Sequence, residues 1–107
     1  MREPTYYVLL TLLDKPLHGY AIAKRSAELS DGAVTLAAGT LYGALDRLET
    51  DGLVKIASEE IVNGRKRRSY TITDAGRRAV LGEIARMRSA VAAAETSVDL
   101  SNIAGAL

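Results

Sequence analysis

Apolar residues in the first half of the chain recur every three or four positions, the spacing of one face of an α-helix. Residues 5–13 predict a short buried helix that Thr5 can cap and that ends before Pro16. Residues 19–29 and residues 38–51 each combine one apolar stripe with polar residues. These two segments therefore predict two further amphipathic helices.

The pattern changes period after Gly52, a residue suited to the left-handed position that follows a helix. Apolar and polar residues alternate over 53–60 and again over 68–73, which predicts two β-strands. Asn63-Gly64 stands between these strands, and this dipeptide strongly favours the tight turn of a hairpin. A two-stranded β-hairpin is therefore expected directly after the third helix.

A longer fourth helix is predicted from Asp74 to Glu95 or beyond, with Thr73 as its cap. Its apolar residues recur at alternating intervals of four and three positions, which is the seam of a heptad repeat. The seam residues are Val80, Ile84, Met87, Val91, Ala94 and Val98. Such a seam can pack on the protein's own core. The first three helices already fill a small core, however, so we expect a second copy of the chain to cover the seam, with help from the N-terminal helix.

Helix, helix, turn, helix and hairpin, in that order, form a winged helix-turn-helix. We therefore expect a mainly α-helical fold with a small β-hairpin. Residues 1–73 would be the winged helix-turn-helix DNA-binding domain, and residues 74–107 a long C-terminal dimerisation helix with its tail, all in one compact unit. The segment after Ser97 is expected either to add a helical turn or to fray. Its apolar residues are Val98, Leu100, Ile103 and Leu107.

The third helix is narrow enough to enter the major groove of DNA, and its outward face is expected to meet it. Small residues in its first turn, including Gly39, let the backbone approach the DNA closely. Thr40 and Tyr42 can donate hydrogen bonds to phosphates or base edges. Arg47 can reach a phosphate or a guanine.

The 107 residues carry 14 Lys and Arg against 13 Asp and Glu, a net charge of only +1. A nucleic-acid partner would therefore require the positive charge to be concentrated at one place. The hairpin tip meets this requirement with four consecutive cations, Arg65, Lys66, Arg67 and Arg68. Such a tip can also be an ordinary solvated turn. In combination with the preceding helices, it predicts strongly salt-dependent DNA binding.

Other kinds of site find little support in the sequence. The chain has no cysteine and one histidine, so no usual zinc site is expected, and no cofactor either. His18 is best interpreted as a structural residue at a helix start, although a metal site that pairs it with carboxylates stays open. No catalytic motif is visible, and we expect no enzyme. No segment has the character of a membrane span or signal peptide, so a cytoplasmic protein is expected.

Several of these segments resemble the PadR family of transcriptional regulators. The resemblance covers about residues 8–80 and rests chiefly on the paired motifs HGY at 18–20 and GTLY at 39–42. Further matches are Leu17, Ala44, Leu45, Arg47, Leu48, Glu49, Gly52, Leu53, Arg67, Tyr70, Ile72, Thr73, Ala75, Gly76 and Arg77. The length is similar to that of the short PadR subgroup. In that subgroup one C-terminal helix follows the β-hairpin, which is called the wing, and mediates dimerisation.

The resemblance implies a homodimeric repressor that binds a palindromic promoter site, often near its own gene or a stress or efflux gene. It also implies DNA contacts by Thr40 and Tyr42, backbone contacts by Tyr20 and Lys24, and wing contacts by residues 65–67. A small-molecule or ion effector is compatible with it, and an aromatic effector would have to rely on Tyr6 and Tyr7.

The sequence departs from the family at the start of the third helix. The family often has Ser-Pro before its GTLY motif and Pro after it, where this chain has Ala37, Ala38 and Gly43. The missing serine cap weakens the helix start by about 1 kcal/mol. A protein-interaction module without specific DNA binding is the alternative function. Neutralising residues 65–67 would abolish DNA binding but leave such a module largely intact.

Overall fold

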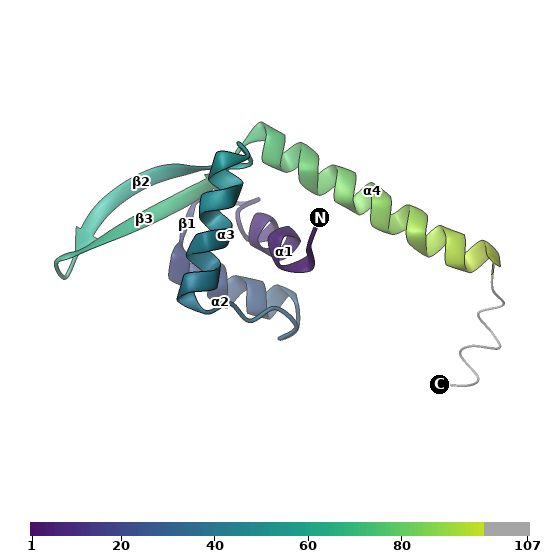
Figure 1. The fold of residues 1–107 in the computed structure, drawn as a ribbon, viewed down its shortest axis with the longest axis horizontal. Helices are drawn as coiled ribbons and strands as arrows, with labels where there is room; N and C mark the ends of the chain where they lie inside the picture. Colours follow the sequence, from purple (N-terminus) through teal and green to yellow (C-terminus); the bar gives the residue numbers. More distant parts are fainter. Residues whose placement is uncertain (98–107) are drawn as a thin grey trace.

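The computed structural model describes residues 1–97, and three of its four helices form the globular part of the molecule (Figure 1). They are α1 (Glu3–Thr11), α2 (Gly19–Leu29) and α3 (Ala38–Thr50). The buried cluster that joins them to the sheet and to the last helix consists of Val8, Leu9, Leu12, Ile22, Leu41, Leu45, Leu48, Val54, Tyr70, Ile72 and Val80. The predicted fold class, a winged helix-turn-helix followed by a long helix, is confirmed.

The prediction for α1 is wrong in its details. The helix begins at Glu3 rather than Thr5 because Pro4 occupies its first turn, where a missing N–H costs nothing. Arg2 is the residue before the helix, and its side chain makes no capping hydrogen bond. Thr5 therefore lies inside the helix and cannot cap it. The last helical residue is Thr11, two positions before the predicted end at Leu13.

The hairpin consists of β2 (Val54–Val62) and β3 (Arg65–Ile72), and it extends well beyond the helices (Figure 1). Its turn is the predicted one, with φ of 53° at Asn63 and 77° at Gly64. These left-handed dihedrals are those of a tight hairpin turn. Both strands reach closer to the turn than predicted, because backbone pairing continues along the exposed end of the hairpin.

A third strand, β1 (Leu17–His18), was not expected from the sequence. It pairs antiparallel with β3, with Leu17 opposite Tyr70, and the sheet has the order β1-β3-β2. Two residues are too few to show an alternating pattern, and their extended conformation depends on pairing with a distant strand. This pairing places the start of α2 beside the hairpin.

One extra residue in β2 shifts the strand register between Ile56 and Ser58. Ile56 pairs with Tyr70, whereas Ser58 pairs with Ser69. Without this β-bulge, the register set at the turn would place Val54 on the opposite face of the sheet from Ile72, its observed partner on β3. The bulge therefore lets both halves of the hairpin form, one fixed by the core and one fixed by the turn.

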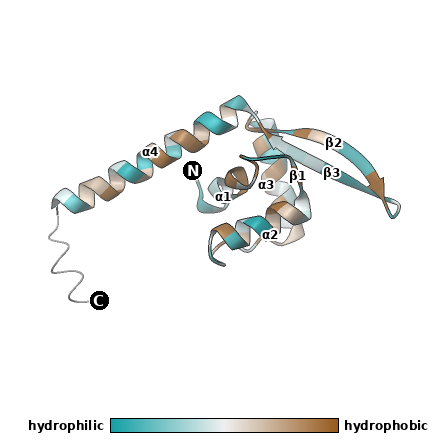
Figure 2. Ribbon diagram, turned by 180° about the vertical axis from the view of Figure 1, so that it is seen from behind, coloured by the Kyte–Doolittle hydropathy of each residue, from teal (hydrophilic) through white to brown (hydrophobic). Residues whose placement is uncertain are grey.

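The last helix, α4 (Asp74–Ser97), leaves the globular part as a long arm (Figure 1). Thr73 caps it as predicted, because the Gly76 N–H donates to Thr73 Oγ1 at 3.0 Å. The same hydroxyl donates to the Gly52 carbonyl at 2.6 Å and so ties the end of α3 to the start of α4. Apolar and polar residues alternate along the arm (Figure 2). Residues 98–107, including Val98 of the predicted seam, lie outside the described part of the chain.

Within residues 1–97, no helix has both the length and the hydropathy needed to cross a membrane. The same part of the chain contains no group of three potential His, Cys, Asp or Glu metal ligands.

Candidate nucleic-acid interface

Helix α3 presents to solvent the face that is predicted to contact DNA, called the reading face below. Its apolar residues Leu41, Ala44, Leu45 and Leu48 are buried against the other helices and the sheet. The predicted contact residues Gly39, Thr40, Tyr42 and Arg47 are all exposed. Ala37 precedes the helix and makes no side-chain cap, as expected from the missing serine, yet α3 still begins at Ala38.

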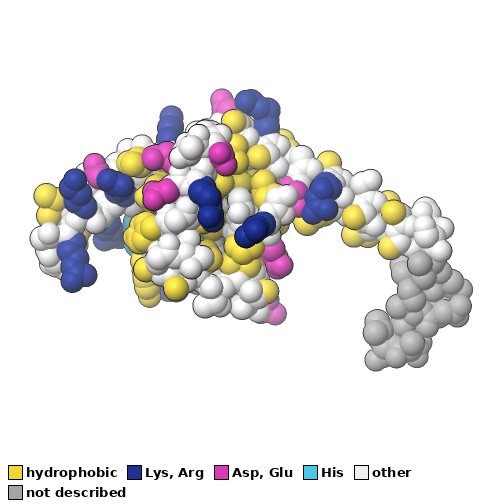
Figure 3. Space-filling model, in the orientation of Figure 1, with side chains coloured by type: hydrophobic (Ala, Val, Ile, Leu, Met, Phe, Trp, Pro, Cys, Tyr) yellow, Lys and Arg dark blue, Asp and Glu magenta, His cyan; other side chains and the backbone are white. Residues whose placement is uncertain are grey.

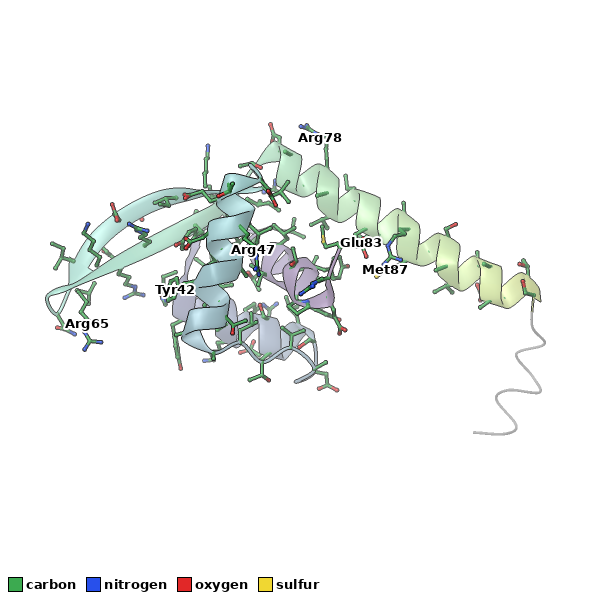
Figure 4. The ribbon with its side chains drawn as sticks, viewed as in Figure 1. Tyr42, Arg47, Arg65, Arg78, Glu83 and Met87 are labelled. Carbon is green, nitrogen blue, oxygen red and sulfur yellow. The ribbon has the colours of Figure 1, made fainter. Side chains whose placement is uncertain are left out.

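Tyr42 lies on the side of α3 that faces the hairpin, and Arg47 lies on the other side (Figure 4). Tyr42 borders a cleft of about 530 Å³ between the helices and the hairpin. The other residues around this cleft are His18, Gly19, Tyr20, Lys66, Arg67 and Arg68. Two tyrosines from two helices thus stand opposite three cations of the wing, an arrangement suited to holding an anionic strand.

The two tyrosines are exposed at the mouth of the cleft. The side chain of Tyr20 is 75% exposed and that of Tyr42 is 45% exposed, so both hydroxyls can reach a ligand. A second hollow of about 290 Å³ continues along α3, where Asp46 and Tyr70 join Tyr42 and two wing cations. Burial raises the pKa of the Tyr70 phenol.

His18 occupies the position before α2 and caps that helix. Its Nδ1 accepts the backbone N–H of Ala21 at 3.4 Å. Burial lowers the pKa of this imidazole, and the nearby positive charge of Arg67 lowers it further, while Glu60 opposes them. The neutral form, which alone has a free nitrogen to accept this bond, is therefore favoured.

The wing cations differ in their partners. Arg68 Nε donates to Glu59 Oε1 at 2.7 Å, and Arg67 Nε lies 3.9 Å from Glu60 Oε1. Arg65 and Lys66 form no ion pair within the described residues. Figure 3 shows Lys and Arg side chains gathered on the hairpin. The sequence alone does not indicate which cations Glu59 and Glu60 face, because that depends on the strand register.

Two predicted DNA contacts lie away from the cleft. Lys24 is exposed on α2, where it borders a groove of about 550 Å³ between α1 and α2. Arg47 is exposed on the other flank of α3. The structure thus brings together Tyr20, Tyr42, Lys66 and Arg67 but leaves these two cations separate.

The predicted α4 seam divides into a covered half and an uncovered half. Ile84 packs against the core, and Met87 is half-buried at the edge of a cavity of about 240 Å³ between α1 and α4. Val91, which is 58% exposed, and Ala94 have no such cover. The prediction for Val80 needs correction. This residue is only 2% exposed because it packs within the chain's own core, so it has no surface to offer a second chain.

Glu83 lies beside this seam with 8% of its side chain exposed. Arg86 Nη2 donates to Glu83 Oε1 at 2.5 Å. This hydrogen bond lowers the pKa of the Glu83 carboxyl. The ion pair thus keeps the carboxylate charged next to α1, at the junction between the globular part and the arm.

An exposed third helix, a hairpin beside it and a two-residue strand at the start of α2 define a winged helix-turn-helix protein. The chain belongs to the transcriptional regulator PadR-like family, whose model matches residues 8–81. The family resemblance predicted from the sequence is therefore confirmed, as is the expectation of a regulator rather than an enzyme.

Individual relatives agree with this assignment. Transcriptional regulator Rv3488 of Mycobacterium tuberculosis is 40% identical over 74 residues, which are 69% of this chain and 65% of the relative. The match therefore spans slightly less than two thirds of that protein's length. A transcriptional regulator from Clostridium thermocellum superposes with a TM-score of 0.73 at 23% identity, covering 89% of this chain and 92% of that one.

Another similar structure is that of Bacillus subtilis PadR in complex with operator DNA. Its TM-score is 0.68 at 23% identity, over 78% of this chain and 48% of that one. At this identity the likeness concerns the fold alone.

Proposed function

We propose that the chain is a cytoplasmic DNA-binding repressor that recognises a palindromic promoter site as a homodimer. The observation that carries this proposal is the convergence of Tyr20, Tyr42 and Lys66 on one cleft between the α3 reading face and the wing. Two hydroxyls and a cation there can hold a sugar-phosphate strand while α3 enters the adjacent major groove. The operator complex of Bacillus subtilis PadR, a protein of the same fold, supports the proposal.

Homodimerisation is proposed through the uncovered half of the α4 seam. Val91 and Ala94 continue the apolar stripe that Ile84 and Met87 begin, and within the described chain nothing covers them. A second copy packed on this stripe by two-fold symmetry would bury it. Two recognition helices spaced about one DNA turn apart, roughly 34 Å, would then match a palindromic site.

Regulation by a small molecule or ion is also proposed, with stress or efflux genes as the expected targets. The cavity between α1 and α4 is the place that best supports an effector. It is lined by Tyr6, Tyr7 and Met87, close to the proposed dimer seam. A ligand there could change how α4 is held and hence the spacing of the two recognition helices.

The test is binding to a labelled duplex from the chain's own upstream region, titrated across salt beside a scrambled duplex. We expect preferential binding of the upstream duplex, one dimer per site, with a steep salt dependence. A variant with Arg65, Lys66 and Arg67 all changed to Gln should lose this binding while remaining folded and dimeric. If neither duplex binds even at low salt, the proposal fails and the protein-interaction alternative gains support.

A further inference from the structure

The wing contains its own counter-charges. The strand register places Glu59 directly opposite Arg68 and Glu60 directly opposite Arg67. The first pair is a hydrogen-bonded ion pair of 2.7 Å, and the second has a closest N–O distance of 3.9 Å. The Arg68 hydrogen bond lowers the pKa of the Glu59 carboxyl, so this group remains charged at neutral pH. Two of the four consecutive wing cations are thus paired within the hairpin.

Stability gives only a weak reason for placing acids here. Both pairs are exposed to solvent, beyond the part of the hairpin that packs on the core. Exposed ion pairs add little to the stability of a fold. A carboxylate on a surface that meets DNA would also repel phosphates, so its position calls for another explanation.

The cations without ion pairs are at the end of the hairpin. Arg65 follows the turn directly (Figure 4), and Lys66 borders the cleft that contains Tyr42. Neither has a carboxylate within ion-pair distance among the described residues. These two side chains are therefore the wing groups that can neutralise phosphates without first breaking a pair.

We infer that Glu59 and Glu60 limit the affinity of the wing for DNA by holding Arg68 and Arg67, which leaves Arg65 and Lys66 to make its phosphate contacts. The inference rests on the proposed DNA-binding function and specifies which wing residues act in it. Phosphate contacts are independent of sequence, so the two acids reduce binding to every duplex alike. Because both affinities fall by the same factor, the ratio of specific to non-specific affinity is unchanged, and only the absolute affinity for DNA is lowered.

The test compares Glu59→Gln with Glu28→Gln on the upstream and scrambled duplexes. Glu28 is a matched control because it forms an exposed pair with Arg25 at 3.2 Å, outside the wing. Glu59→Gln should raise affinity for both duplexes by the same factor and steepen the log-log salt slope by about 0.9. That change corresponds to a roughly 3.5-fold greater loss of affinity between about 50 and 200 mM salt. Glu28→Gln should change neither quantity.

A double-mutant cycle separates the release of Arg68 from simple removal of a negative charge. Arg68→Gln alone should change affinity much less than Lys66→Gln, because Glu59 already holds Arg68. In the Glu59→Gln background, Arg68→Gln should remove the whole gain. Adding Glu60→Gln to Glu59→Gln should increase the affinity again, this time through Arg67. Thermal unfolding of each variant verifies that it remains folded.

Three results would overturn the inference. They are a Glu59→Gln affinity no higher than that of Glu28→Gln, a Glu59→Gln affinity below that of the wild type, or a loss of DNA affinity in Arg68→Gln as large as that in Lys66→Gln. The last two would mean that the pair holds Arg68 in position for DNA. Wild-type protein that binds neither duplex would overturn the proposed function itself. This result differs from one in which the wild type binds DNA but Glu59→Gln brings no gain in affinity.

Discussion

The phenol ring of Tyr42 lies against the α-carbon of Gly19. A Cβ atom built at position 19 would be 2.5 Å from Tyr42 Oη and 2.9 Å from its Cζ, closer than van der Waals contact allows. Gly19 opens α2, and Tyr42 projects from α3, so the contact connects two helices that border the same cleft. The absence of a side chain at position 19 therefore determines where the Tyr42 hydroxyl stands.

Gly19→Ala is expected to impair DNA binding much more than folding. The atoms that the new methyl group meets are at the far end of a side chain that can swing away, so the free energy of unfolding should change by less than about 1 kcal/mol. DNA affinity should fall because Tyr42 leaves the cleft. Thermal unfolding and duplex binding measure the two effects. In a Tyr42→Ala background, Gly19→Ala should cost no further affinity, and an additional loss there would contradict this explanation.

Gly76→Ala is expected to destabilise the whole fold. A Cβ at this position would overlap the backbone carbonyl oxygen of Leu53 and lie 2.6 Å from Ile72 Cγ1. A carbonyl of the main chain cannot swing away, so the cost should be about 1–3 kcal/mol, as for an overpacked core.

The matched control is Gly82→Ala on the same helix, where a Cβ meets nothing within 4 Å. This variant should gain up to about 1 kcal/mol from helix propensity. Urea unfolding of both variants gives the comparison. Equal free energies of unfolding would mean that α4 can move away from Leu53, contrary to the close contact described above.

Local chemistry explains which elements the sequence predicts well. The bounds of α2, the turn at Asn63-Gly64 and the cap at Thr73 depend on neighbouring residues, and the structure has all three where expected. Helix α3 ends within one residue of its predicted end for the same reason, because Gly52 adopts a left-handed φ of 75°.

What the sequence could not predict depends on contacts between distant segments. Strand β1 exists because it pairs with β3, and the bulge near Ile56 reconciles two registers set independently. Val80 fits a heptad seam in sequence, yet it is buried in the core cluster of its own chain. The pairing of Glu59 with Arg68 likewise needs the register. The exposure of the candidate contact residues on α3 was therefore predictable, but which of them border the same cleft was not.

The stability of the fold should depend on the charge of His18. Its pKa is lowered from the ordinary 6.5, mainly by burial and then by Arg67, so the folded chain binds a proton less readily than the unfolded chain. Below about pH 6.5 the unfolded state therefore takes up the proton first, and stability falls as pH decreases until the folded state is protonated too. Above that range the neutral imidazole contributes its full capping interaction.

His18→Asn isolates this effect, because asparagine is also a good helix cap but does not titrate. Between about pH 7.5 and pH 5.5 the wild type should lose more free energy of unfolding than this variant, as measured by urea unfolding. The carboxylates titrate in both proteins and cancel in the comparison. Identical pH dependence in the two would show that His18 does not contribute.

Val91→Lys should weaken the proposed dimer without unfolding the chain. Val91 is 58% exposed, so a lysine there should change the stability of the isolated chain by less than about 0.5 kcal/mol. In a seam between two α4 helices, the same lysine would bring a charge into an apolar contact, which is costly unless it is paired. The dimer dissociation constant should rise at least about tenfold, which corresponds to about 1.4 kcal/mol.

Ser89→Lys is the matched control for this prediction, because it adds the same charge two residues earlier, on nearly the opposite side of the helix. Sedimentation analysis over a range of concentrations should find Ser89→Lys as dimeric as the wild type and Val91→Lys shifted toward monomer. Because a monomer holds only one recognition helix, Val91→Lys should also bind a full palindrome little better than a half-site. If both variants remain equally dimeric, the interface lies elsewhere on the molecule, and a monomeric wild type would remove the basis for a palindromic site.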